Sequence, residues 1–328
     1  MSRTPLAITL AALATLGLTG CSGMTESTQT GGGEIKKLTL IVPADPGGGW
    51  DQTARAMQKV LEEEKLVSNA QVVNIGGAGG TVGLARLANE KDPNTLMVMG
   101  YVMVGAVETN KSTATLADTT PIARLTEESE IVVVPANSPY MSVTELLDAA
   151  KEQGKAISIA GGSAGGADHI LAGQMYQAHG VDTKNLNYIP YSGGGESMAA
   201  LLGGKVSAGI SGVGEYAEQV KSGKLRALAV SGPGPSDLLP DVPSLKDEGV
   251  DVELTNWRGA VAPGTIDDAQ AEALTDLLTE LHDSAAWKAE LKKNGWADAF
   301  QTGPEFDAYL DDEIKTVRAT LREIGLVK

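Results

Sequence analysis

Four glycine clusters, each between a predicted strand and a predicted helix, constrain the fold of this chain more than any other feature of its sequence. They occupy residues 46–49, 76–80, 161–166 and 192–195. Short apolar, β-branched runs precede the clusters, and segments with helical periodicity follow them. Strands and helices that alternate in this way form parallel sheets with crossover helices. The sequence therefore predicts an α/β fold.

The same patterns assign elements to most of the chain. Strands are expected at residues 37–42, 71–75, 95–99, 131–134, 157–160, 186–189, 206–210 and 225–230. Helices are expected at residues 52–65, 81–88, 142–153, 167–179, 196–202, 211–222, 267–284, 286–293 and 304–324. Two glycine clusters precede a crossover expected near Pro135, and two follow it. This order suggests two lobes, each giving two loops to one cleft.

The position of the glycine clusters favours binding of an anion. Ligands of open α/β sheets bind at the carboxyl ends of the strands, where the following helices begin. Glycine allows close approach of the backbone, and helix amino termini present free N–H groups with a partial positive charge. The formal net charge of −16 opposes such binding only weakly, because salt screens charges beyond about 8–10 Å. The alternative, that the glycines only form tight turns, stays open.

The N-terminal segment predicts export. Arg3 is followed by a short apolar run over residues 6–18 and then by Leu18, Thr19, Gly20 and Cys21. This is the pattern of a secretory signal (residues 1–20), and the run is too short to span a bilayer. The four residues ending at Cys21 resemble a bacterial lipobox, and Cys21 is the single cysteine of the chain. An ordinary signal peptide with a chance cysteine is the alternative.

Residues 22–33 are rich in Ser, Thr, Gln and Gly and cannot bury much apolar surface. We therefore expect a lipidated Cys21 and a flexible tether over residues 21–35, which would hold the body at the outer face of a membrane. In an envelope with two membranes the body would be periplasmic.

Composition and motifs argue against several other classes. The chain has 26 basic and 42 acidic residues without a basic block, so nucleic acid is a poor partner. One cysteine and three scattered histidines give no pattern for a transition-metal site. The glycine fingerprint of dinucleotide sites and the phosphate loop of the Walker type are both missing from the sequence. We expect no metal and no cofactor.

Several segments resemble the TctC/Bug family, the extracytoplasmic receptors of tripartite tricarboxylate transporters. The first match is residues 40–55, which read LIVPADPGGGWDQTAR. Further matches follow in order at residues 77–83, 161–171, 191–204, 223–230 and 257–263. The resemblance therefore extends from about Leu38 to the C-terminus.

The resemblance implies a two-lobed periplasmic-binding-protein fold of the Venus flytrap, type II-like kind, with parallel-rich sheets flanked by helices and two crossing strands. Lobe 1 would be discontinuous, comprising residues 36–134 and 252–328, and lobe 2 would comprise residues 135–251. It also implies a monomeric receptor without catalytic activity. The receptor would capture a small polycarboxylate, citrate first, and deliver it to the membrane subunits of a transporter. Aromatic carboxylates remain an alternative.

The resemblance also supplies candidate ligand-binding residues. In lobe 1 the backbone of two loops would hold one carboxylate, through Gly47, Gly48, Gly49, Trp50, Ala78, Gly79, Gly80 and Thr81. Lobe 2 would close on the ligand with Ser163, Ala164, Gly165, Tyr191, Ser192, Gly193 and Gly194. We interpret Asp51 as a helix cap or loop brace, since an acid would repel an anion.

Five further positions complete the candidate site. Ala44 stands where many relatives have Phe, which implies a roomier pocket. Ser211 stands where relatives that bind amino acids tend to have Asp, which favours a ligand without an amino group. Trp257 and Arg258 could add an aromatic wall and a fixed cation, although Arg258 could equally form a structural ion pair. His169 is expected in the first turn of a helix near the ligand.

Two other functions fit parts of the sequence. Residues 161–165 match the Gly-x-Ser-x-Gly pattern of serine hydrolases, with Ser163 as nucleophile. His169 and His179 lie too soon after this serine, and His282 lies in a polar helical stretch, so we expect no catalysis. A sensory protein that presents its ligand to a receptor kinase would have the same fold and pocket, and the sequence does not separate it from a transport receptor.

Overall fold

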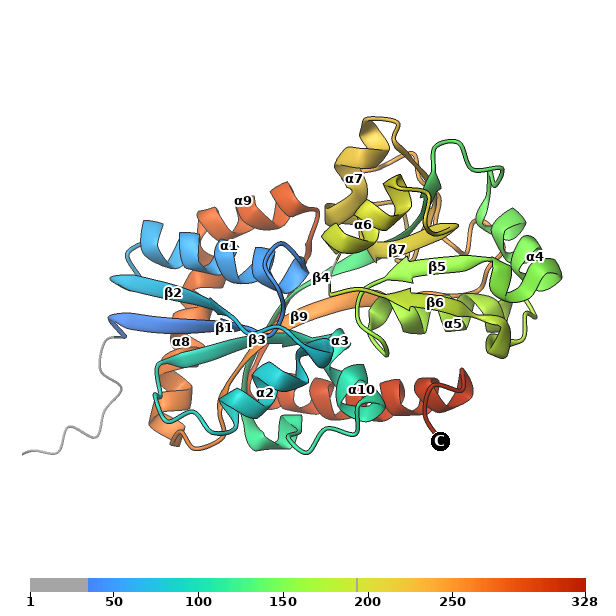
Figure 1. Ribbon diagram of the computed structural model, residues 1–328. Helices are drawn as coiled ribbons and strands as arrows, with labels where there is room; N and C mark the ends of the chain where they lie inside the picture. Colours follow the sequence, from blue (N-terminus) through green and yellow to red (C-terminus); the bar gives the residue numbers. More distant parts are fainter. Residues whose placement is uncertain (1–34, 193) are drawn as a thin grey trace, which may run out of the picture. The chain divides into compact units, whose positions relative to one another are not determined.

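The computed structural model describes residues 35–192 and 194–328 (Figure 1). The predicted signal sequence, Cys21, the predicted tether and Gly193 lie outside the described residues. Within the described part of the chain, strands and helices alternate as the sequence predicts. None of the described helices combines the length and the apolar character needed to cross a membrane.

The strands and helices are numbered in chain order. The strands are β1 (Lys37–Val42), β2 (Asn69–Asn74), β3 (Thr95–Gly100), β4 (Thr119–Pro135), β5 (Ser158–Gly161), β6 (Asn187–Pro190), β7 (Ala208–Gly212), β8 (Leu225–Val230), β9 (Thr255–Pro263) and β10 (Ala297–Thr302). The helices are α1 (Gly49–Glu63), α2 (Thr81–Leu87), α3 (Tyr101–Thr109), α4 (Val143–Gln153), α5 (Ala167–Ala178), α6 (Gly194–Leu202), α7 (Val213–Lys221), α8 (Asp268–Asp283), α9 (Ala285–Asn294) and α10 (Gly303–Glu323).

Strand β4 joins two groups of strands. Its N-terminal part, Thr119 to Ser129, pairs with β9, which in turn pairs with β3 beside the parallel strands β1 and β2. Its C-terminal part, Glu130 to Pro135, pairs with β7 and β8, and β7 continues into the parallel strands β5 and β6. Figure 1 shows β4 running from one group of strands to the other. A strand of 17 residues is long enough for this because each residue adds about 3.3 Å.

The helices bury their apolar faces against these strands. In α1, the predicted face of Ala54, Met57 and Leu61 is completely buried, and α9 lies beside this helix (Figure 1). All six residues of β3 are buried, as expected for a strand covered on both sides. The four glycine clusters follow β1, β2, β5 and β6, each directly before a helix. The predicted placement of the clusters is confirmed.

Four elements differ from the sequence prediction. Strand β4 begins twelve residues before the predicted start at residue 131. Its N-terminal part is polar and shows no alternation of apolar residues, so the sequence did not predict it. It is a strand because β9 and β10 pair with it on its two sides. Helix α3 was not predicted, since it is apolar around most of its circumference and lacks helical periodicity. Strands β9 and β10 lie in segments to which the sequence patterns assigned no element, and both pair with β4.

Candidate ligand-binding site

The loops after β1, β2, β5 and β6 converge on one pocket of about 700 Å³, counting the open solvent at its mouth. Its lining consists of Pro43, Ala44, Asp45, Gly48, Gly49, Trp50, Gly77, Ala78, Gly79, Gly80, Val102, Gly162, Ser163, Asp168, Ser192, Gly194, Ser211, Gly212, Glu215, Asn256 and Arg258. The predicted glycine loops therefore do meet at a single site.

Helix amino termini surround this pocket without side-chain caps. Helices α1, α2 and α7 begin after Gly48, Gly80 and Gly212, and no side chain caps any of the three. Elsewhere in the chain, the hydroxyl of Ser142 and the carboxylate of Asp267 cap α4 and α8. The first N–H groups of a helix need an acceptor. At the pocket, a bound anion can serve as that acceptor.

Two glycines allow the close packing that shapes the pocket. A Cβ atom on Gly49 would collide with the guanidinium group of Arg258. A Cβ atom on Gly80 would lie 2.8 Å from Met103 and 2.9 Å from the ring of Trp50, and Gly80 also has a positive φ of 92°. These positions need glycine for contact as well as for backbone conformation.

Asp51 braces the first loop, as predicted. Its Oδ2 accepts hydrogen bonds from the backbone N–H of Gly47 at 3.0 Å and from Nε of Arg55 at 2.8 Å. Its Oδ1 accepts one from the side-chain amide of Asn74 at 3.0 Å. Burial alone would raise the pKa of Asp51, but the hydrogen bonds from Arg55, Asn74 and Gly47 outweigh it and lower the pKa. Asp51 is therefore an ionised anchor beneath the loop.

Arg258 is both an ion-pair partner and part of the pocket lining. Its Nη2 pairs with Oε1 of Glu128, and both side chains are almost fully buried. Its Nη1 is buried and has no hydrogen-bond partner among the described residues. The guanidinium carbon lies 5.5 Å from the ring centre of Trp296. A buried cation with an unused donor is suited to bind a carboxylate.

Buried and half-buried acids lie around the same pocket. Asp168 accepts a hydrogen bond of 2.5 Å from the backbone N–H of Gly162, yet burial raises its pKa to about 6. Burial, with the neighbouring Glu128, raises the pKa of Glu215 to about 7. Behind them, Glu130 is completely buried, and both its carboxylate oxygens lack partners among the described residues. Burial and the nearby Asp168 raise its pKa well above the ordinary range, which favours the neutral acid.

The structure brings most of the predicted site residues together. Those that line the pocket are Ala44, Gly48, Gly49, Trp50, Ala78, Gly79, Gly80, Ser163, Ser192, Gly194, Ser211 and Arg258. An adjoining hollow shares Ala78, Gly79, Ser163 and Ser192 with the pocket. It adds two further predicted residues, Ala164 and Tyr191. Gly193 lies outside the described residues.

Three predicted residues shape the loops from outside the pocket. Gly47 has a φ of 98°, which explains the glycine there. The hydroxyl of Thr81 donates to the carbonyl of Ala78 at 3.0 Å. Gly165 has a φ of 79° and packs against Thr109. None of the three is part of the pocket lining.

His169 lies in the first turn of α5, as predicted, but its contacts are structural. Its ring stacks on Tyr188 with 4.0 Å between the ring centres, and its Nδ1 accepts the backbone N–H of Gly165 at 3.1 Å. Burial lowers its pKa to about 4. Because Nδ1 is occupied and the ring is stacked, His169 is not arranged as a general base for Ser163.

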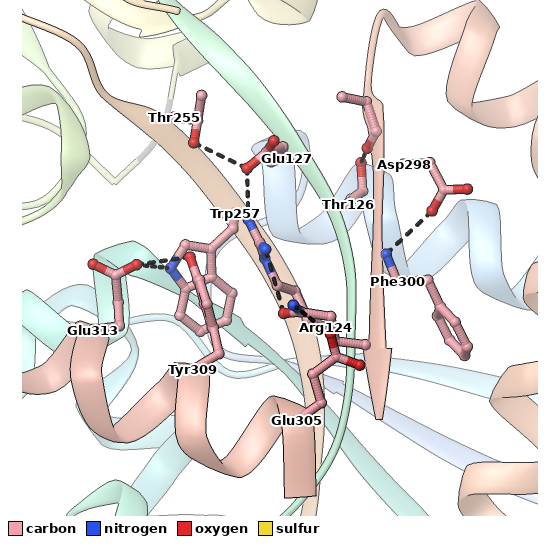
Figure 2. A network of polar contacts seen from close by, with 12 residues as sticks. Arg124, Thr126, Glu127, Thr255, Trp257, Asp298, Phe300, Glu305, Tyr309 and Glu313 are labelled. Atoms are coloured by element: carbon pink, nitrogen blue, oxygen red, sulfur yellow. Dashed lines mark hydrogen bonds and ion pairs between the residues drawn. The ribbon is translucent and has the colours of Figure 1, made fainter. Parts of the chain in front are cut away.

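Trp257 does not form the expected aromatic wall. It is completely buried, and its indole N–H donates to Glu313 at 3.1 Å. Figure 2 shows its ring beside Tyr309, whose hydroxyl donates to the same glutamate. Adjacent residues of a strand point to opposite faces of a sheet. Since Arg258 faces the pocket, Trp257 faces α10 on the other side.

Several lining residues were not predicted. Pro43, Asp45, Gly77 and Gly162 are direct neighbours of the predicted loops, so a wider window around each cluster would have included them. Val102, Asp168, Gly212, Glu215 and Asn256 come from elements whose approach to the pocket depends on the topology. For Glu215 the one signal in the sequence was its position four residues after Ser211, whose hydroxyl donates to it at 3.2 Å.

Comparison with known proteins supports the likeness seen in the sequence. Residues 53–326 match the model of a family described as "Tripartite tricarboxylate transporter family receptor". A relative from Agrobacterium vitis, "UPF0065 protein in the TAR-I ttuE-ttuC' intergenic region", is 30% identical over 74% of this chain and 70% of its own length. "Protein BugT" of Bordetella pertussis is 26% identical over 88% of this chain and 90% of its own length.

Solved structures show the same fold. The periplasmic binding protein BugD has a TM-score of 0.81 at 23% identity, covering 89% of this chain and 99% of its own. MatC of Rhodopseudomonas palustris, solved with bound malate, has a TM-score of 0.76 at 20% identity over 88% and 99% of the two chains. Rpa4515 of R. palustris, solved with adipate, has a TM-score of 0.80 at 21% identity over 88% and 97%. The predicted periplasmic-binding-protein fold is therefore confirmed.

Proposed function

Because this chain belongs to the receptor family of the tripartite tricarboxylate transporters, we propose that it captures a small polycarboxylate outside the cytoplasm for delivery to membrane subunits of such a transporter. The observation that carries this proposal is the pocket itself. Uncapped helix amino termini after Gly48, Gly80 and Gly212 meet the buried donor of Arg258 there. Backbone N–H groups and one guanidinium form a site for carboxylates, and capture requires no chemical step.

The number of donors is sufficient for useful affinity. A hydrogen bond to a charged group contributes roughly 1.5–3 kcal/mol. Micromolar binding corresponds to about 8 kcal/mol, so a few such bonds, reduced by the cost of ordering the ligand, reach that range.

We further propose that the ligand is held between two lobes that close on it. Lobe 1 would comprise residues 36–134 and 252–328, and lobe 2 residues 135–251. Both groups contribute to the pocket, the first with Trp50 and Arg258 and the second with Ser163 and Ser192. Strand β4, which pairs with strands of both groups, is the natural connection for such a closure.

Citrate is the first ligand that we propose. The family's receptors serve tricarboxylate transport, and related structures contain the dicarboxylates malate and adipate. Ser211 stands where an acid would favour a ligand with an amino group. Glu215, however, places a carboxyl group beside Ser211 in the structure. Amino-substituted carboxylates therefore belong in the ligand panel.

The test of this function is the melting temperature of the purified protein with a panel of ligands. The panel contains citrate, tricarballylate, succinate, malate, adipate, glutamate, terephthalate and phosphate. A ligand at 100 times its Kd stabilises the folded state by about 2.7 kcal/mol, which raises the melting temperature by several degrees. A rise with a polycarboxylate supports the proposal. If no carboxylate raises the melting temperature, the proposed function is rejected.

We also propose that Cys21 carries a lipid and anchors a monomeric receptor to the outer face of the membrane. The lone cysteine after a short apolar segment supports this. Replacing Cys21→Ser should move the protein from the membrane fraction to the soluble extracytoplasmic fraction. A variant that stays with the membrane would contradict lipid anchoring.

A further inference from the structure

The pocket contains more acidic than basic side chains, although the proposed ligand is itself an anion. Asp168, Glu215 and the exposed Asp45 line it together with Arg258. The positive charge of Arg258 is already balanced by the buried Glu128. At close range in a buried site, a ligand carboxylate beside an ionised acid would be strongly repelled. Binding of a polycarboxylate therefore requires that an acid in the pocket be neutral.

Glu215 is the acid placed to meet the ligand in neutral form. Its Oε2 accepts the hydroxyl of Ser211 at 3.2 Å and packs directly over Gly194, so its position is fixed. That hydroxyl is its only hydrogen-bond partner among residues 35–192 and 194–328, whereas Asp168 is held by the N–H of Gly162. Glu215 Oε1 is thus available for a proton and for a ligand oxygen.

The charged groups around Glu215 come from four elements. Glu128 and Glu130 face it from β4, Asp168 from α5 and Arg258 from β9. Glu196 of helix α6, which supplies Gly194, is engaged with the backbone N–H of Ser192. Glu128 and Asp168 oppose the ionisation of Glu215, and the single cation, Arg258, is paired with Glu128. This balance favours the neutral acid, consistent with the raised pKa of Glu215.

Two other ways of relieving the repulsion have less support. A bridging metal ion would need a cluster of ligating side chains, and the described residues contain no group of three or more suited to hold one. An ammonium group on the ligand would need an ionised Glu215, which the surrounding acids disfavour.

We propose that Glu215 is a specificity-determining residue that donates a hydrogen bond to a carboxylate of the ligand as the neutral acid, so that the receptor takes up a proton together with the polycarboxylate. The proton comes from solvent, stays on Glu215 in the complex and returns to solvent when the ligand leaves. No covalent bond changes. The inference rests on the proposed function, because it concerns how that same pocket accepts an anion.

The first measurement is the Kd of the purified protein at pH values from 6.5 to 8.5. The probe is citrate, or malate, succinate or adipate if the melting panel identifies one of these instead. Between pH 7.5 and 8.5 the Kd should weaken by about tenfold, since one proton coupled to binding changes affinity tenfold per pH unit above the pKa of the free group. Titration calorimetry in two buffers of different ionisation enthalpy at pH 8 should show uptake of one proton per ligand.

Three variants assign the proton. Glu215→Gln keeps the shape of the neutral acid but cannot ionise, so its Kd should change less than twofold over the same pH range. Glu218→Gln, on the exposed side of α7, is the matched control and should keep the tenfold change. Asp168→Asn tests the other pocket acid, and it should also keep the pH dependence.

Three results would overturn the inference. The first is a parent protein that binds the carboxylate with the same Kd from pH 7.5 to 8.5. The second is loss of the pH dependence in Asp168→Asn while Glu215→Gln retains it. The third is a folded Glu215→Gln that binds more than tenfold more weakly at pH 6.5, which would indicate an ionised Glu215 facing a cationic group. Absence of carboxylate binding at every pH would instead reject the proposed function.

Discussion

The guanidinium group of Arg258 forms a buried ion pair with the carboxylate of Glu128 and still has a free donor beside the pocket. The pair joins two strands, β9 and β4, directly behind the glycine loops. Glu128 thus holds the cation in place without using all its donors. This arrangement links the stability of the fold to the proposed binding of an anion.

Replacing Arg258→Gln should therefore cost both binding and stability. Removing one partner of a buried ion pair typically destabilises a protein by about 3–5 kcal/mol, because the other charge remains buried. Chemical denaturation and citrate titration measure the two effects separately. The double variant Arg258→Gln with Glu128→Gln should recover most of the stability but not the binding. If the double variant binds citrate as tightly as the parent, Arg258 is not a ligand contact.

Substitution of Gly49→Ala should weaken ligand binding by about tenfold or more, equivalent to about 1.4 kcal/mol. A Cβ atom at this position would displace the guanidinium of Arg258, whereas the φ of Gly49 is one that alanine readily adopts. The effect is therefore steric. Gly195→Ala is the matched control, because a Cβ atom there has no neighbour within 4 Å. Equal loss of affinity in both variants would show that the contact with Arg258 is not the cause.

The glycine loops could be predicted from the sequence because glycine records a local requirement. Gly80 has a left-handed backbone and touches Trp50, and both demands exclude a side chain. Each of these requirements selects glycine at a single position, so the position can be recognised without knowing which residues lie across the pocket. The order of strands and helices was predictable for a similar reason, since apolar periodicity is local.

The acids of the pocket could not be predicted in the same way. Helix α7 is amphipathic, and a glutamate such as Glu215 on an amphipathic helix is typical of a solvent-exposed side chain. Only the pairing of β7 with β4 brings it near Glu128, and that pairing joins residues about 80 positions apart. Trp257 was predicted to line the site with its neighbour Arg258. Adjacent residues of a strand point to opposite faces, so Trp257 lies on the other face of β9.

The brace formed by Asp51 should matter for both the first loop and the fold. Asp51→Ala removes the hydrogen bonds from Gly47, Arg55 and Asn74 and leaves the half-buried amide of Asn74 with one partner fewer. We expect a loss of about 1–3 kcal/mol in the free energy of unfolding, the cost of unsatisfied buried polar groups, and weaker citrate binding. Arg55 is half exposed, so its ion pair adds little to this.

The control for Asp51 is Glu63→Ala, an exposed acid at the other end of α1. It should change the free energy of unfolding by less than about 0.5 kcal/mol, as is usual for surface positions. Denaturant titration at pH 7 measures both variants. An Asp51→Ala protein as stable as Glu63→Ala would contradict the assignment of Asp51 as a brace.

Asp168 and Glu215 should each reduce the stability of the ligand-free protein as the pH rises from about 4 to 8. Folding raises the pKa of Asp168 to about 6 and that of Glu215 to about 7, whereas in the unfolded chain both titrate near 4. Below the unfolded pKa both states are protonated and these acids cost nothing. As the pH rises towards the folded pKa, the unfolded state gives up its protons first and is therefore favoured.

Glu215→Gln should remove part of this pH dependence. The variant cannot ionise, so at pH 8 it should be more stable than the parent by on the order of 1–3 kcal/mol, since each pKa unit corresponds to about 1.4 kcal/mol. At pH 4 the difference should vanish, because the parent's Glu215 is then neutral as well. Denaturant titrations at pH 4, 6 and 8 without ligand measure this difference, with Glu218→Gln as the control. If the difference in free energy of unfolding between Glu215→Gln and the parent were the same at all three pH values, Glu215 would not change its charge state in this range. Protonation of Glu215 would then not be what relieves the repulsion between the acids of this pocket.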